Sequence, residues 1–313
     1  MKQVKIGNSE FKASAVALGI MRMDKLSVDE AVTILEETKN DGINFIDSAN
    51  VYGMGKAEEI FGKAFKKSSL TRSDFYIQSK GGIYCNPDRN MEITRYDFSQ
   101  ANLINTVDGI LQRMGIDYLD SFLLHRPDAL MDPAEIATAF DILQRDGKVR
   151  HFGVSNLNPL QVELIQSGIN QKLLINQLQF GVMHTGPVDF GIHTNMLDKR
   201  SIDHDGGVLE YSRLHNMTIQ AWSPFQYGQF EGTFIDDPNH QEVNDELQKL
   251  GDKYHVSKNA IATAWILRHP AKLQVIAGTM NPMHLRDSAK GADVELTAQE
   301  WYDIYMAAGN DLP

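Results

Sequence analysis

Hydrophobic residues along this 313-residue chain follow two alternating spacings. Short apolar runs, which are typical of buried strands, are separated by longer stretches whose apolar residues recur every three or four positions, as in amphipathic helices. After a hairpin that turns near Gly7-Asn8, the runs cover residues 15–19, 43–47, 75–80, 118–125, 149–156, 173–177, 218–223 and 273–278. The pattern therefore predicts a hairpin followed by eight strand–helix units.

Regular alternation of strand and helix predicts parallel strands joined by right-handed crossovers. Eight such units favour a closed barrel over an open sheet. Local signals agree, because Asp132-Pro133 is typical of a helix start, whereas Asn40-Asp41-Gly42 and Asp146-Gly147 are typical of helix ends. We predict one α/β domain over residues 1–313, a (β/α)8 TIM barrel with an N-terminal β-hairpin. Residues 180–207 are expected to form a long polar loop that covers one rim or the active-site mouth.

Composition narrows the choice of partners. The chain has 42% hydrophobic residues, enough for a large core, and 30 basic against 41 acidic residues give a net charge of −11. This charge repels a phosphate backbone and an anionic membrane surface, so we expect no nucleic-acid or membrane partner. A single cysteine, Cys85, excludes an internal disulfide and favours a reducing compartment. With no apolar signal at the start and no run of about 18 apolar residues, the expected location is cytoplasmic.

A metal site is not expected from the histidines of the long loop. His184, His193 and His204 are separated by 9 and 11 residues, which matches no compact ligand pattern. We therefore predict chemistry without a metal.

Four polar residues stand at or just beyond the ends of three apolar runs: Asp47, Tyr52, Lys80 and His125. An ionisable residue at the carboxyl end of a buried parallel strand is costly as packing, yet barrel enzymes place their chemistry there. Asp47, Tyr52 and His125 each also have a structural interpretation when taken alone, as a turn former, a core aromatic and a buried histidine, respectively. Their coincidence on successive strands favours a catalytic set.

These residue types suit the delivery of a proton. A tyrosine hydroxyl titrates near about 10 in water, so it is a poor acid at neutral pH unless a cation stabilises the phenolate. Lys80 is placed to supply that cation, and Asp47 on the adjacent strand is placed to keep Lys80 charged. His125 can orient a substrate oxygen or relay a proton. Protonation of an oxygen that becomes an alkoxide is the task in carbonyl reduction.

The segment Gly42-Ile43-Asn44-Phe45-Ile46-Asp47-Ser48-Ala49-Asn50-Val51-Tyr52-Gly53 resembles the signature of the aldo-keto reductase superfamily. The resemblance continues nearly end to end through residues 77–80, 123–127, 153–156, 176–177, 221–224 and 276–279, in the order that the family shows. It implies a (β/α)8 barrel that binds NADP(H) across its carboxyl-end face, without a metal. The chain has no Gly-x-Gly-x-x-Gly fingerprint of a Rossmann domain, which agrees.

The resemblance also implies a role for each matching position. Tyr52 becomes the general acid, Lys80 and Asp47 the pair that lowers its pKa, and His125 the group that orients the carbonyl. Ser155, Asn156 and Gln177 would hydrogen-bond the nicotinamide carboxamide, and Trp222 would stack on its ring, although Trp222 alone also suits an ordinary core indole. The expected cofactor-binding residues are Gly19, Met21, Asp47, Ser155, Asn156, Gln177, Trp222, Ser223, Pro224, Phe225, Gly278, Thr279, Met280, His284 and Arg286.

The residues after the last predicted strand bear on the choice of dinucleotide. Thr279 offers a hydroxyl and Arg286 a cation for a 2′-phosphate, whereas His284 stands where many relatives have arginine. We expect NADPH, with NADH as a weaker alternative. Arg286 has an equally simple interpretation as an exposed charge on a helix.

Two functions are consistent with these residues. One is an NADP-dependent reductase of aldehydes or ketones, and the other is a cofactor-sensing subunit like the cytoplasmic subunits of potassium channels. The chain begins almost directly at the predicted barrel, which favours the enzyme. Met23, Met54 and Tyr84 are expected to give the substrate pocket an apolar, adaptable lining for a small-molecule carbonyl. The sequence does not predict an oligomeric state.

Overall fold

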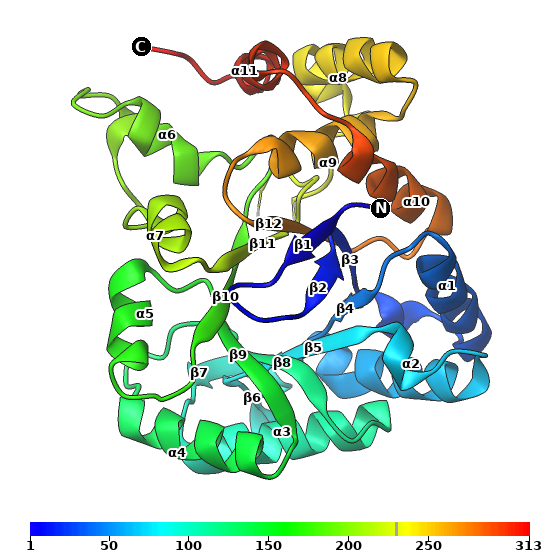
Figure 1. Cartoon of the computed structure of the whole chain (residues 1–313), viewed down its shortest axis with the longest axis vertical. Coiled ribbons are helices and arrows are strands. Elements are labelled where there is room, and N and C mark those ends of the chain that lie inside the picture. The colour runs from blue at the N-terminus through cyan, green and yellow to red at the C-terminus, as the bar shows by residue number, and fades with distance from the viewer. Residues whose placement is uncertain (229–230) are drawn as a thin grey trace.

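The computed structural model describes residues 1–228 and 231–313, and the parallel strands of this part of the chain close into a barrel (Figure 1). Their order around the barrel is β3-β4-β5-β8-β9-β10-β11-β12. The strands are β3 (Val16–Gly19), β4 (Phe45–Asp47), β5 (Tyr76–Gly81), β8 (Leu119–Leu124), β9 (Val149–Ser155), β10 (Leu173–Gln179), β11 (Thr218–Trp222) and β12 (Leu273–Ala277). Each of the eight predicted runs overlaps one of these strands, so the (β/α)8 prediction is confirmed.

Helices cover the outside of the barrel (Figure 1). The first, α1, begins at a capping box in which the Ser27 hydroxyl accepts from the Glu30 amide, and α4 begins at the predicted Asp132-Pro133. The helices are α1 (Val28–Asn40), α2 (Lys56–Lys67), α3 (Gln100–Met114), α4 (Pro133–Arg145), α5 (Pro159–Gln166), α6 (Gly186–Ile192), α7 (Val208–His215), α8 (Gln241–Tyr254), α9 (Lys258–Arg268), α10 (Pro282–Lys290) and α11 (Ala298–Ala307). No helix in the described part of the chain is long and apolar enough to cross a bilayer.

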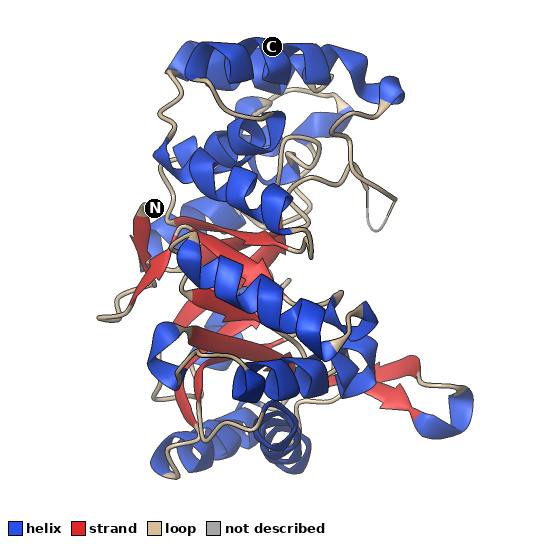
Figure 2. Ribbon diagram, turned by 90° about the vertical axis from the view of Figure 1, so that its right-hand side faces the viewer, coloured by secondary structure: helices blue, strands red, loops and turns tan. Residues whose placement is uncertain are grey.

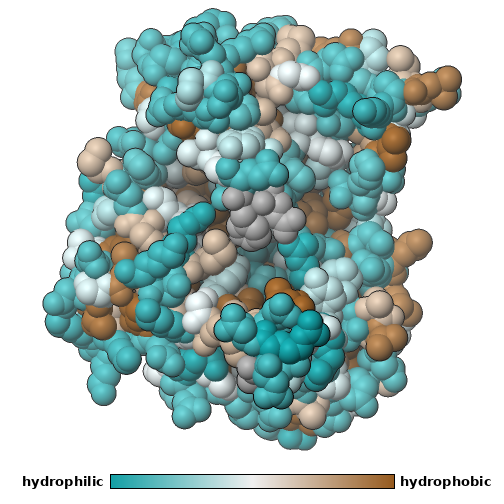
Figure 3. Space-filling model, turned by 180° about the vertical axis from the view of Figure 1, so that it is seen from behind, coloured by the Kyte–Doolittle hydropathy of each residue, from teal (hydrophilic) through white to brown (hydrophobic). Residues whose placement is uncertain are grey.

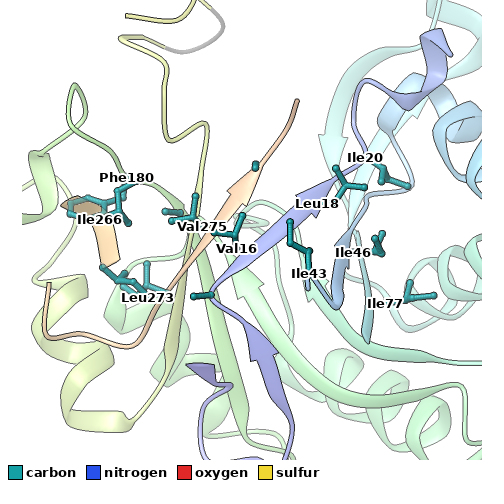
Figure 4. Packing of buried hydrophobic residues seen from close by; sticks show 14 of the residues in the cluster. Val16, Leu18, Ile20, Ile43, Ile46, Ile77, Phe180, Ile266, Leu273 and Val275 are labelled. Carbon is teal, nitrogen blue, oxygen red and sulfur yellow. The ribbon is translucent and has the colours of Figure 1, made fainter. Parts of the chain in front are cut away.

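Alternate residues of each barrel strand face opposite sides, because the side-chain period of a strand is two. Val16, Leu18 and Ile46 belong to the large apolar cluster between strands and helices, part of which is drawn in Figure 4. Phe45, which precedes Ile46, belongs to the second apolar cluster, in which strand residues pack with the N-terminal hairpin. Asp47 shares the face of Phe45. The strand period therefore carries this carboxylate toward the barrel interior.

The predicted N-terminal hairpin is present and consists of β1 (Gln3–Lys5) and β2 (Lys12–Ser14). Its turn packs against the first residues of two barrel strands, since the Gly7 amide donates to Thr218 Oγ1 at 2.8 Å. Gly7 has a φ of +53°, and a Cβ there would lie 2.9 Å from that of Leu174. The hairpin thus covers the amino end of the barrel and leaves the carboxyl-end face for a site.

A second hairpin follows β5 and was not predicted. Strands β6 (Ile83–Asn86) and β7 (Glu92–Tyr96) pair antiparallel and project from the body of the barrel (Figure 2). Every residue of β7 is exposed.

The predicted loop over residues 180–207 is partly wrong. This segment contains helix α6 and the 3-10 turn Lys199–Ser201. Arg200 pairs with Asp189 at 3.2 Å and donates to the carbonyl oxygen of Gly309 at 2.7 Å, which ties the segment to the C-terminal residues. Its residues are not among those that line the large cavity described below, so it does not form the wall of the mouth.

Candidate active site

Three neighbouring barrel strands bring the predicted catalytic residues together. Asp47 ends β4, Lys80 lies on β5, and His125 directly follows β8. Tyr52 follows β4 in the turn Tyr52–Gly55, where Gly53 has a φ of 55°. A side chain at Gly53 would meet Asp24, because its Cβ would lie 2.7 Å from the Asp24 Cβ. This tight turn sets where the tyrosine leaves the backbone.

Lys80 is the centre of the group and is fully buried. Its Nζ donates to Asp47 Oδ2 at 2.8 Å, to the carbonyl oxygen of Ser48 at 2.7 Å and to the Tyr52 hydroxyl at 3.2 Å. The three donors of the ammonium therefore have three acceptors. A buried ammonium needs such compensation, since burial otherwise favours its neutral form.

The electrostatic balance differs between lysine and tyrosine. Burial alone would lower the pKa of Lys80, but the Asp47 carboxylate and the Tyr52 oxygen outweigh it and raise the pKa above its ordinary value. Burial raises the pKa of Tyr52, and the Lys80 ammonium offsets only part of that rise. The Lys80 ammonium thus lowers the pKa of Tyr52 as expected, whereas burial and the Asp47 charge raise it and keep the pKa above its ordinary value. Tyr52 is protonated at neutral pH and holds a proton that it can donate.

His125, which follows β8, faces Tyr52, which follows β4. The two rings meet edge to face, with centroids 6.0 Å apart. Burial lowers the pKa of His125 well below its usual value, and the charges of Lys80 and Arg126 add to that effect. The imidazole is accordingly neutral at pH 7 and can donate one N–H to an oxygen without carrying a charge.

A large cavity opens beside these residues at the carboxyl-end face, which is hollowed near its middle in Figure 3. Its volume is about 1070 Å³, the size of a site for a cofactor with a substrate. Lys80 lies beneath it. The cavity is lined by these predicted residues: Gly19, Met21, Asp47, Tyr52, His125, Ser155, Asn156, Gln177, Trp222, Ser223, Pro224, Phe225, Gly278, Thr279, Met280 and His284.

The polar residues at the floor of the cavity have defined orientations. Asn156 Nδ2 donates to Ser155 Oγ at 2.8 Å, while its Oδ1 accepts from Trp222 Nε1 at 3.1 Å. Asn156 has a φ of 63°, a left-handed conformation that asparagine adopts more readily than most residues. Ser155 Oγ in turn donates to the carbonyl oxygen of Gln177 at 2.9 Å. Strands β9, β10 and β11 are thus linked where an amide-bearing ligand would meet them.

Comparison with known proteins identifies the family. The model of the Aldo/keto reductase family matches residues 15–307. The chain belongs to the aldo/keto reductase family. A 6-dehydroglucose reductase from Agrobacterium fabrum is 32% identical over 277 residues, which cover 88% of this chain and 86% of that protein.

Proteins of lower identity to this aldo/keto reductase have different names. A probable voltage-gated potassium channel subunit beta from Arabidopsis thaliana is 25% identical over 321 residues, covering 94% of this chain and 92% of that protein. Among solved structures, a glycerol dehydrogenase from Gluconobacter oxydans superposes with a TM-score of 0.77 at 23% identity, covering 97% of this chain and 94% of that one. The structural match supports the fold.

The predicted substrate residues of this aldo/keto reductase need correction, because none of the three lines the cavity. Met23 is fully buried in the main core, and Met54 is 49% exposed. Tyr84 lies under the guanidinium of Arg95, which is 3.7 Å from the ring centroid. In the sequence, a single apolar residue outside the predicted strands and helices carries no signal for the direction in which its side chain points.

The prediction for Arg286 is also not supported by the structure. Its Nε donates to Asp41 Oδ1 at 2.8 Å, and its Nη2 pairs with Glu37, both at the end of α1. Arg286 is not among the cavity-lining residues. Its charge is already neutralised by two carboxylates, so we do not assign a 2′-phosphate to it.

Sequence reasoning missed several residues of the cavity. The β6–β7 hairpin supplies Ile83, Ile93 and Tyr96. Successive residues of β6 face opposite sides of the strand, so Ile83 faces the cavity and Tyr84 faces away from it. This alternation can be used only once the strand itself is known. The cations that line the cavity are Arg22, Arg126 and Lys258. Arg126 directly follows His125, so its sequence position could have pointed to it.

Proposed function

We propose that this protein is an NADP-dependent reductase that converts aldehydes or ketones to alcohols. The observation that carries the proposal is the buried Lys80 ammonium, which contacts both Asp47 and the Tyr52 hydroxyl beside a large cavity. A structural lysine gains nothing from lying against a phenol at the edge of a ligand cavity. A proton-donating tyrosine gains a cation for the phenolate that it leaves behind.

The chain's own residues account for the proton side of the reaction. A bound NADPH supplies the hydride for the carbonyl carbon. His125, being neutral, donates a hydrogen bond that orients the carbonyl oxygen. Tyr52 transfers its proton to this oxygen as negative charge develops there. The Lys80 ammonium then stabilises the tyrosinate, and Asp47 compensates the buried lysine charge throughout.

The residues of the cavity fit a nicotinamide cofactor. Ser155, Asn156 and Gln177 present hydroxyl and amide groups, which pair well with a carboxamide that both donates and accepts. Trp222 lines the same region and offers an aromatic surface for the nicotinamide ring. These residue types and their grouping support the assignment of the nicotinamide to the part of the cavity that is lined by Ser155, Asn156, Gln177 and Trp222.

The cations at the other parts of the cavity suit the cofactor phosphates. Arg22 is anchored by donation from Nη1 to the carbonyl oxygen of Gly278 at 2.9 Å. Lys258, at the start of α9, pairs with Asp236, whose side chain is 73% exposed and is therefore readily displaced by a phosphate. Thr279 and His284 line the cavity as well. We assign the 2′-phosphate to Lys258 and Thr279, which favours NADPH over NADH.

The end of the cavity that we assign to the substrate is lined by apolar side chains and by the cation of Arg126. Ile83, Ile93 and Tyr96 of the hairpin face the same cavity as Tyr52 and suit a broad range of small carbonyl compounds. The Agrobacterium relative is named for 6-dehydroglucose, a carbonyl compound. We propose a small-molecule carbonyl substrate of this general kind.

A cofactor-sensing role is the second candidate, and the channel-subunit relative is the observation that favours it. The catalytic set of Asp47, Tyr52, Lys80 and His125 is by itself compatible with both functions. Turnover separates them, because a sensor binds the cofactor tightly without appreciable carbonyl reduction.

The test measures NADPH consumption by the purified protein with 4-nitrobenzaldehyde, beside a Tyr52→Phe variant. NADPH binding to both proteins is checked by the quenching of tryptophan fluorescence. We expect turnover in the parent, and its loss in a variant that still binds NADPH. Tight NADPH binding without turnover across a wide carbonyl panel would contradict the reductase and favour the sensor.

A further inference from the structure

Four glutamines occupy the barrel interior beneath Asp47. Gln78 on β5, Gln177 on β10, Gln220 on β11 and Gln274 on β12 are each at most 2% exposed. TIM barrels usually fill this space with branched apolar side chains, and a buried amide costs free energy unless it is hydrogen-bonded. This group therefore calls for an explanation beyond packing.

The amides form a hydrogen-bonded chain with a defined direction. Gln274 Nε2 donates to the carbonyl oxygen of Ser14 at 2.8 Å, and Gln274 Oε1 accepts from Gln220 Nε2 at 2.8 Å. A backbone carbonyl can only accept, so Gln274 must direct its NH2 group toward Ser14. Gln220 must then direct its own NH2 group toward Gln274, which leaves its Oε1 for the next members of the chain.

The chain ends on the proposed catalytic carboxylate. Gln220 Oε1 accepts from Gln78 Nε2 at 2.7 Å and from Gln177 Nε2 at 2.9 Å. The same two amide nitrogens also donate to Asp47 Oδ1, at 2.6 Å and 3.0 Å. Asp47 Oδ2 is thereby left for Lys80. An oxygen that accepts two amide donors suits an ionised carboxylate, because a protonated oxygen would oppose one of them.

We propose that the amides of Gln78 and Gln177, which both donate to Asp47 Oδ1, are a positioning device for Asp47, and that Gln78 is its principal positioning residue. The inference rests on the proposed function, since it concerns how the Lys80–Tyr52 contact is maintained. The carboxylate of an aspartate rotates readily about its last torsion. Holding Oδ1 with two amides keeps Oδ2 against the Lys80 ammonium, and this holds the ammonium against Tyr52.

Gln78 is the best position at which to test the proposal. Its Oε1 accepts from Ser121 Oγ at 2.8 Å, so both ends of its amide are occupied. It is not among the residues that line the cavity, whereas Gln177 is, and a change at Gln177 would also alter the proposed cofactor site. Gln274 provides a matched control, because it is equally buried but makes no contact with Asp47.

The experiment compares Gln78→Met, Gln78→Glu and Gln274→Met with the parent. We expect Gln78→Met to lower kcat about tenfold while the KM values for NADPH and the aldehyde stay nearly unchanged. The alkaline limb of its pH–rate profile should move to higher pH, because a displaced Lys80 offsets less of the burial of Tyr52. Gln78→Glu should lower kcat further, since it places a second acid against Asp47. Gln274→Met should lower the Tm while kcat and the alkaline limb remain those of the parent.

A second readout does not require turnover. In protein labelled with 3-fluorotyrosine, the Tyr52 resonance is identified by its loss in Tyr52→Phe and is titrated by fluorine NMR. Gln78→Met should raise the Tyr52 midpoint, and Gln274→Met should not. Equal effects of the two methionine substitutions on Tyr52, or none from Gln78→Met, would overturn the positioning role. A parent that reduces no carbonyl but shows the expected fluorine shifts would instead refute the proposed function alone.

Discussion

At the scale of single residues, the proposed chemistry depends on a charge that the fold holds out of water. Lys80 has no contact with solvent, yet its ammonium has acceptors from Asp47, Ser48 and Tyr52. Removing one partner of a buried ion pair is costly, because the remaining charge stays buried without compensation. Each partner of Lys80 therefore affects the proton that Tyr52 can deliver.

Asp47→Asn tests this dependence. The substitution keeps the shape of the side chain but removes the charge that sustains the Lys80 ammonium, so the lysine should tend to lose its proton. We expect kcat to fall by about a hundredfold, within the range of general acid catalysis, while circular dichroism shows an intact fold. Steady-state kinetics across pH provide the measurement. A variant whose kcat and pH–rate profile match those of the parent would exclude Asp47 from the mechanism.

Arg126 should influence the choice of substrate. It lines the cavity next to His125 in the sequence, and its guanidinium carbon lies 5.8 Å from the centre of the Trp222 ring. It makes no ion pair within the described chain, so its charge is available to an anionic group of a substrate. We expect Arg126→Met to lower kcat/KM about tenfold for 4-carboxybenzaldehyde, but little for methyl 4-formylbenzoate. Equal losses for the acid and the ester would show that Arg126 does not recognise charge.

At the scale of elements, the cations of the neighbouring helices α9 and α10 have different roles. The first residue of α9, Lys258, lines the cavity, whereas Arg286 of α10 joins that helix to α1 through Asp41 and Glu37. Lys258→Met should raise the KM for NADPH about tenfold and change the KM for NADH little. The matched Arg286→Met should change neither KM. A larger effect from Arg286 than from Lys258 would reverse our assignment of the 2′-phosphate.

Helix α2 is anchored to the barrel by a buried acid. Glu58 is fully buried, pairs with Arg113 Nη2 at 2.8 Å, and accepts from Ser79 Oγ at 2.8 Å. We expect Glu58→Ala to lower the free energy of unfolding by about 3 kcal/mol, as measured by urea denaturation, because it leaves Arg113 without its partner. The adjacent exposed Glu59→Ala is the control and should change stability by less than about 0.5 kcal/mol. Equal changes would show that the buried pair contributes no more than the surface charge.

The elements that were predicted correctly share one property, a local sequence signal. The barrel strands follow from apolar runs, and Asp47 and Lys80 follow from their places on those runs. The partners of Arg286 could not be predicted in this way, because Asp41 lies 245 residues away in the sequence. Every residue of β7 is exposed and only Ile83 of β6 is buried, so the short apolar pattern of the hairpin indicated neither a strand nor a cavity wall. Local periodicity predicts elements, whereas long-range pairing requires the structure.

At the scale of the whole molecule, stability should fall in acid in two stages. Burial, assisted by the charge of Arg213, lowers the pKa of His269 to about 4. Burial alone would raise the pKa of Glu300, but hydrogen bonds from Lys253, Thr297 and Tyr254 lower it to about 2. In both cases the unfolded chain binds protons at a higher pH than the folded chain does. Stability therefore rises with pH through each window.

The two windows can be separated by mutation. As the pH falls below about 6.5, the unfolded His269 becomes protonated while the folded one does not, and stability is lost until about pH 4. Glu300 contributes stability above about pH 4.5, which is lost as the pH falls toward 2. Urea denaturation at a series of pH values should show a shallower first stage in His269→Asn and a shallower second stage in Glu300→Gln. An unchanged slope of the unfolding free energy against pH in the second stage of Glu300→Gln would contradict this prediction. The hydrogen bonds that join α11 to α8 at Glu300 would then not be a source of acid sensitivity, and other carboxylates would have to account for it.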